Sequence, residues 1–136
     1  MYEKIISIEE CSFSRNCPGW RGEEWFEGYI VTTENQTFKV GISSGQSCCE
    51  NYGYLTTNDD LSEYIGAHLV QVATVDTALD VQSIEEQGLT SVDACMFVNF
   101  STSKGTMQLV AYNEHNGYYG HTAVVISESF NYELNL

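Results

Sequence analysis

The chain has 136 residues, of which 43% are hydrophobic and 12% aromatic, so its composition excludes a disordered protein. The length fits a single domain, residues 1–136, with a hydrophobic core of its own. Its 19 acidic residues outnumber five basic ones, giving a formal net charge of −14. This charge excludes direct binding to nucleic acids and anionic membranes, whose phosphates attract Lys and Arg. The partners it favours are basic, including the nucleic-acid-binding surfaces of other proteins.

The sequence predicts a cytoplasmic protein. Met1 leads into Tyr2-Glu3-Lys4-Ile5-Ile6 without the basic and apolar regions of a signal peptide, and no apolar run is long enough to cross a membrane. An odd number of cysteines without a secretion signal favours free thiols. These cysteines are Cys11, Cys17, Cys48, Cys49 and Cys95.

The first third of the chain predicts strands. Residues 4–11 alternate and predict a strand, whereas 12–24, with Pro18 and two glycines, predict a loop of tight turns. Residues 25–33 are aromatic and β-branched, as in strands. After a turn at Glu34-Asn35, residues 36–43 form the returning strand of a hairpin.

One short helix is expected near residues 59–65. Asn58 or Thr57 would cap it, and Asp59 and Asp60 would stabilise the positive end of its dipole. Gly66 would adopt the left-handed conformation that ends it.

The second half predicts further strands at 69–77, 94–102, 106–112 and 121–127, with a tight turn at Lys104-Gly105. Residues 47–54 and 78–92 have no clear periodicity. Short connections favour antiparallel order. We therefore expect an α+β fold, mostly antiparallel β with about seven strands and the one helix.

Acidic residues are the candidates for binding a basic partner. The simplest interpretation, without a binding function, is that they keep the protein soluble, cap the helix or line solvated loops. The candidate partner-binding residues are Glu23, Glu24, Glu27, Asp59, Asp60, Glu63, Glu85 and Glu86, with Glu9 and Glu10 beside them.

Two segments, 47–54 (SCCENYGY) and 115–121 (HNGYYGH), are dense in polar and aromatic groups, and we expect them to lie together as a ligand-binding loop pair. The candidate ligand residues are Cys48, Cys49, Glu50, Asn51, Tyr52, His115, Asn116, Tyr118, Tyr119 and His121. A wider aromatic set suits a contact surface, although part of it belongs to the core. That set is Trp20, Trp25, Phe26, Tyr52, Tyr54, Tyr118 and Tyr119.

The same segments argue against a metal or a catalytic thiol. Adjacent cysteines point to opposite faces of an extended chain, and the spacing of zinc sites is absent, so we expect no metal and no cofactor. A nucleophilic Cys48 or Cys49 would use His115 or His121 as base, but the acidic surroundings oppose a lowered thiol pKa. An enzyme is therefore the less favoured alternative, and we assign no catalytic residue.

The strings SCCENYGY, NDDLSEYIGA (58–67) and HNGYYGH, in this order, resemble a family of small uncharacterised bacterial and phage proteins with a domain of unknown function. The resemblance spans about Trp25 to Ile126 and implies a phage or prophage setting. In that setting small acidic proteins inhibit host machinery, including CRISPR nucleases, in the host cytoplasm. We therefore expect a non-enzymatic inhibitor of a basic host protein such as a defence nuclease, acting as a DNA mimic. The alternatives are a small-ligand or nucleotide-signal binding protein and a metal-dependent or cysteine enzyme.

Overall fold

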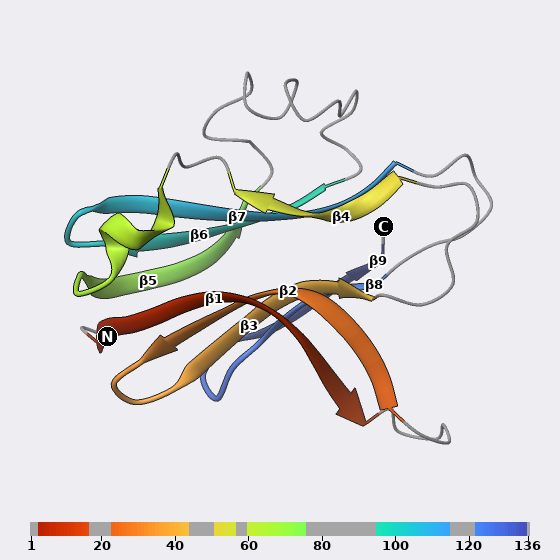
Figure 1. Cartoon of the computed structure of the whole chain (residues 1–136), viewed down its shortest axis with the longest axis horizontal. Helices are drawn as coiled ribbons and strands as arrows, with labels where there is room; N and C mark the ends of the chain where they lie inside the picture. The colour runs from red at the N-terminus through yellow and green to blue at the C-terminus, as the bar shows by residue number, and fades with distance from the viewer. Residues whose placement is uncertain are drawn as a thin grey trace.

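A computed structural model describes residues 3–16, 23–43, 51–56, 60–75, 95–114 and 122–135. Within them nine strands form two layers (Figure 1). Sheet A contains β4 (Asn51–Thr56), β5 (His68–Val75), β6 (Cys95–Thr102) and β7 (Gly105–Glu114). Sheet B contains β1 (Glu3–Asn16), β2 (Glu23–Thr33), β3 (Thr37–Ser43), β8 (Thr122–Ile126) and β9 (Asn131–Asn135).

Strand β1 joins the two sheets. The strand order is β4-β7-β6-β5-β1-β2-β3-β8-β9, and all pairs are antiparallel. Only Glu3 and Lys4 pair with β5, whereas from Ile5 onward β1 pairs with β2. A register shift between Ile5 and Ser7 marks the point where β1 leaves sheet A, as bulges do where strands bend.

The core lies between the sheets, where each strand contributes alternate residues. In β3, Phe38, Val40 and Ile42 are buried on one face, as their spacing predicts. Phe38 meets Phe100 of β6 edge-on, with ring centroids 5.6 Å apart. Strands β6 and β7 are buried on both faces, because Phe97 and Val110 lie in a second cluster on the other side of sheet A.

The expected α+β fold is wrong: within the described residues the protein is antiparallel β, with nine strands rather than about seven and without an α-helix. In place of the helix, Leu61–Tyr64 forms a single 3₁₀ turn. Backbone hydrogen bonds from Gly66 N to Ile5 O and from Ile5 N to Ala67 O, both 2.8 Å, bind the following residues to β1. Seven residues are too few to sustain a helix against this pairing. Gly66 does have the expected positive φ, at +90°.

The expected loop at 12–24 is also partly wrong, because β1 continues to Asn16 and β2 begins at Glu23. Phe13 stacks on Phe26 across the hairpin, with ring centroids 5.5 Å apart, and such cross-strand pairs stabilise a sheet. The Phe13 ring also lies over Gly41, where an added Cβ would come within 2.9 Å of it. The far ends of β1 and β2 curve away from sheet A, as Figure 1 shows.

Candidate functional site

Most residues of the expected ligand-binding loop pair lie outside the described residues. These are Cys48, Cys49, Glu50, His115, Asn116, Tyr118, Tyr119 and His121. Asp59, Glu85 and Glu86 of the acidic set lie outside them too. Asn51 and Tyr52 are placed in β4, and Glu23 in β2.

Residues in or beside the two segments lie side by side. Asn51, inside the first segment, pairs with Glu114, which directly precedes the second. At their other ends, Thr122 N donates a 3.0 Å hydrogen bond to the Ser43 hydroxyl. Both segments therefore connect sheets A and B at the same end of the sandwich, and their meeting there stays a prediction.

The described acids of the expected partner-binding set divide between two ends of sheet B. Glu24 and Glu27 lie near the start of β2, whereas Asp60 and Glu63 lie in or beside the 3₁₀ turn. Gly66 and Ala67, which follow that turn, are hydrogen-bonded to Ile5, and Ile5 pairs with Thr33 at the opposite end of β2. Thr33 is six positions after Glu27, a distance of about 20 Å along the strand. These acids therefore do not form one surface.

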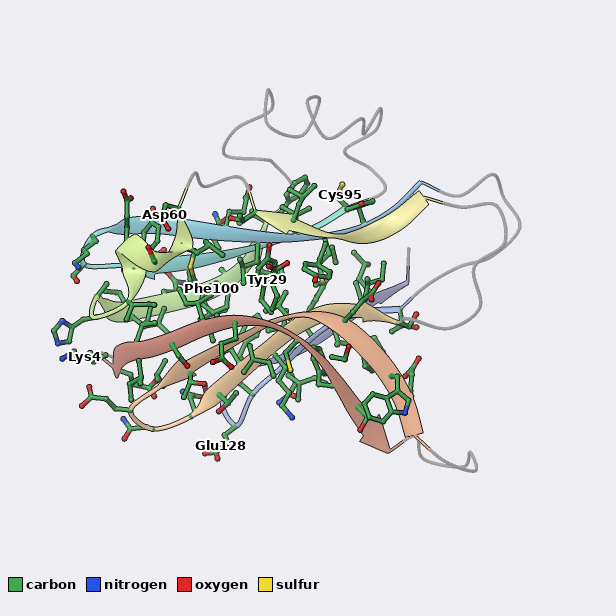
Figure 2. All side chains as sticks on the ribbon, in the orientation of Figure 1. Lys4, Tyr29, Asp60, Cys95, Phe100 and Glu128 are labelled. Atoms are coloured by element: carbon green, nitrogen blue, oxygen red, sulfur yellow. The ribbon has the colours of Figure 1, made fainter. Side chains whose placement is uncertain are left out.

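A different group of residues comes together where the inner faces of β1 and β2 meet β4. Glu10 of β1 pairs directly with Tyr29 of β2, and Glu27 lies two residues from Tyr29 on the same strand face. This face points toward sheet A, because Tyr29 belongs to the core cluster between the sheets. Figure 2 shows Tyr29 between the two layers.

Sheet A contributes Tyr54 from β4, whose ring meets that of Tyr29 edge-on at 5.1 Å between centroids. Trp25, two residues before Glu27, lies on the same face of β2 and is 53% exposed. We call Glu10, Trp25, Glu27, Tyr29 and Tyr54 the acidic–aromatic surface. It combines two carboxylates with three aromatic rings from three strands.

Both tyrosines of this surface are held in the neutral form. Burial raises the pKa of Tyr29 well above its ordinary value, and the charge of Glu10, with that of Tyr54 once it ionises, raises it further. The pKa of Tyr54 is raised by burial, by the charge of Glu10 and a hydrogen bond to its carboxylate, and by the charge of Glu27. The surface thus presents negative carboxylates beside uncharged phenols, an arrangement that attracts a cation.

The described thiols and imidazole do not form a catalytic or metal site. Cys11 is exposed and Cys95 is buried, and neither forms a disulfide bond. Cys95 begins β6, whereas His68 begins β5, whose next residue pairs with Thr102 at the far end of β6. Nowhere in the described ranges do three or more His, Cys, Asp or Glu side chains gather as metal ligands would. None of the helical residues described forms a segment long and apolar enough to cross a membrane.

A hollow of about 580 Å³ lies at the other end of sheet B, by the β2–β3 and β8–β9 turns. It is lined by Thr33, Asn35, Gln36, Thr37, Lys39, Ile126, Ser127 and Glu128. Its Gln36 side chain donates to Glu3 at 2.7 Å and accepts from Ser129 at 2.8 Å. These bonds join the two turns to β1 and account for the polar lining.

The sequence indicated Glu10 and Glu27 as acidic candidates, and Trp25 and Tyr54 as aromatic ones, but it did not indicate Tyr29. The alternation of Trp25, Glu27 and Tyr29 along one strand was the available signal. It was missed because Glu10 and Tyr29 become neighbours only when β1 and β2 pair over their full length.

Comparison with curated proteins and with solved structures found no match for this chain. A family described as a domain of unknown function, DUF7448, matches residues 1–125. This range includes every residue of the acidic–aromatic surface, and the chain belongs to that family.

Proposed function

We propose that this protein is a non-enzymatic binding protein that captures a basic partner through the acidic–aromatic surface. The observation that carries the proposal is that Glu10 and Glu27 both act on Tyr54, while the exposed Trp25 lies two residues from Glu27 on the same face of β2. Exposed aromatic residues beside complementary charge are the usual anchors of protein interfaces. The net charge of −14 adds long-range attraction for such a partner.

The partner we propose is a basic nucleic-acid-binding protein of the bacterial cytoplasm, such as a defence nuclease. A phage origin, implied by the resemblance of the three motifs, would make the protein an anti-defence inhibitor of the anti-CRISPR type. The described acids occupy several faces, since Glu9 and Glu10 alternate on β1 and Glu63 lies by the 3₁₀ turn. We therefore favour blocking of a basic groove by one cluster over imitation of long phosphate rows.

The test is capture from a bacterial lysate on immobilised protein, with mass spectrometry of what stays bound. We expect a basic nucleic-acid-binding protein whose retention falls with salt and is competed by DNA. Retention should be lost in the Glu10→Gln, Trp25→Ala, Glu27→Gln triple variant. It should persist in a matched Glu63→Gln, Glu128→Gln control, whose exposed acids lie elsewhere. Equal retention by the triple variant, or retention unaffected by salt and DNA, would overturn the proposal.

The small-ligand alternative keeps one supporting observation, the pairing of the residues that flank 44–50 and 115–121. A ligand bound there would raise the melting temperature of the protein in a screen of nucleotides and metabolites. The shift should disappear when His115 and His121 are both replaced by Ala. A screen without such a shift removes this alternative.

A further inference from the structure

The hydroxyl of Tyr29 belongs to a buried side chain. This side chain is only 6% exposed, and the structure shows no hydrogen-bond partner for its hydroxyl among the described residues. A buried hydroxyl without a partner costs the folded state free energy, so the lack of one for Tyr29 within the described residues requires an explanation.

The groups around this hydroxyl are complementary to a cation. Glu10 lies directly opposite Tyr29. Glu27 is the diagonal neighbour of Glu10, and such neighbours have Cα atoms about 7–8 Å apart. Both carboxylates act on Tyr54, which closes the group from sheet A. Glu10 is exposed, so the group is accessible to solvent on that side.

None of the three lysines of the chain neutralises this group. Lys4 pairs with His68 at the opposite end of β1, and Lys104 lies in the β6–β7 turn beyond Thr102. Lys39 lies on the outer face of sheet B, with its ammonium 5.9 Å from the Phe13 ring centroid. All three lie far from Tyr29 or on the other face, so none of them lies between the two carboxylates and the Tyr29 phenol.

We infer that Glu10, Glu27, Tyr29 and Tyr54 form a receptor for one arginine side chain of a protein partner. This inference rests on the proposed function and names the group that the acidic–aromatic surface recognises. A guanidinium carries five donors in a planar fork, enough to reach both carboxylates and the Tyr29 oxygen together. It also stacks on aromatic rings, which an ammonium does less well. The neutral state of Tyr29 leaves its oxygen free to accept such a bond.

The probe is a short Gly/Ser peptide with one central arginine, compared with the same peptide carrying lysine or citrulline. Citrulline keeps the shape of arginine but lacks its charge. Titration followed by amide NMR should shift residues 10, 27, 29 and 54 with the arginine peptide. We expect affinity to fall several-fold with lysine and to vanish with citrulline.

Variants of the protein separate the receptor from general acidity. Tyr29→Phe should weaken arginine binding by about threefold to tenfold, the effect of one hydrogen bond, while the fold is retained. Glu10→Gln and Glu27→Gln should each weaken it by about tenfold or more. The matched Glu63→Gln variant should bind as the wild type does. Equal binding of citrulline, or an unchanged affinity in Tyr29→Phe, would overturn the inference.

The two proposals fail in different ways. If the peptide does not bind, but a basic partner is still captured and lost in the triple variant, the arginine receptor is wrong and the proposed function stands. If the peptide binds as expected but no basic protein is captured, the receptor stands and the proposed function is wrong.

Discussion

Tyr54, on the edge strand of sheet A, meets Tyr29 of sheet B edge-on, with ring centroids 5.1 Å apart. An edge-to-face pair of this kind stabilises the contact by about 0.5–1.5 kcal/mol beyond the area it buries. The contact brings the Glu10 carboxylate to two phenols, of which only that of Tyr54 forms a hydrogen bond to it. The packing of the sheets thus creates the cluster on which both proposals depend.

Tyr29→Phe is expected to leave the free protein as stable as the wild type, or more stable by up to about 1 kcal/mol, because it removes an unpaired buried hydroxyl. Tyr64→Phe is the control, since the Tyr64 hydroxyl donates a 3.3 Å hydrogen bond to Thr106 O. That variant should lose about 0.5–1.5 kcal/mol. Urea denaturation measures both. A loss for Tyr29→Phe as large as that for Tyr64→Phe would show that the Tyr29 hydroxyl is bonded.

Alkaline pH should destabilise the protein through the same residue. Because the pKa of Tyr29 is raised above its ordinary 10.0, the folded state holds the phenolic proton more tightly than the unfolded chain does. This contribution to stability is complete below about pH 10 and is lost as the pH rises from there toward the folded-state pKa. Denaturation midpoints measured from about pH 9 to pH 11 should therefore fall.

Tyr29→Phe should reduce this alkaline loss of stability. Glu10→Gln should lower the pKa of both Tyr29 and Tyr54, since the Glu10 charge contributes to raising each. Phenolate absorbance follows the titration directly. A Tyr29→Phe variant with the wild-type alkaline profile would contradict the assignment.

Much of the β structure was predictable because alternating hydrophobic residues within short segments indicate strands. The hairpin of residues 25–33 and 36–43 is confirmed as β2 and β3, and the strands expected at 69–77, 94–102, 106–112 and 121–127 are confirmed within a few residues. Strand β9 was missed because its sequence, NYELN, is polar, and only pairing with β8 makes it a strand. The helix was wrong because local capping signals could not reveal the bonds to Ile5.

The acidic–aromatic surface was only half predictable. Its acids and two of its aromatic residues stood out by type, but its geometry depends on long-range contacts. Tyr29 and Tyr54 are 25 positions apart and meet only because the two sheets pack together. The pairing of Glu10 with Tyr29 needs the long β1–β2 hairpin, which the pattern at 12–24 concealed.

The buried Glu3 carboxylate should stabilise the end of the sandwich remote from this surface. It accepts hydrogen bonds from the Thr33 hydroxyl at 2.9 Å and from Gln36 Nε2 at 2.7 Å. Bonds to a charged acceptor contribute about 1.5–3 kcal/mol, so Glu3→Ala should be clearly destabilising. In a double-mutant cycle with Gln36→Ala we expect a coupling of at least about 0.5 kcal/mol. Additive losses would mean that the two side chains do not interact in solution.

Replacing both carboxylates of the acidic–aromatic surface should stabilise the free protein. Glu10 and Glu27 are diagonal neighbours of like charge, and neither faces a described lysine. Such repulsion is a cost that a binding site carries until its partner arrives. Glu10→Gln, Glu27→Gln should therefore have a higher melting temperature than the wild type at low salt. Because exposed charges are screened over about 8 Å at physiological salt, the difference should shrink as salt is added.

The matched control is Glu63→Gln, Glu128→Gln, which removes the same charge from two exposed positions remote from this surface. Removing any two acids weakens the overall charge repulsion in a chain with a net charge of −14, and the control measures that general effect. The variant at Glu10 and Glu27 should have a higher melting temperature than this control. A Gln oxygen can still accept the hydrogen bond from Tyr54, while the repulsion between the two carboxylates is removed. A double variant less stable than the control would show that the fold depends on the two carboxylates, and their pairing beside Tyr29 would then be structural rather than a site awaiting a cation.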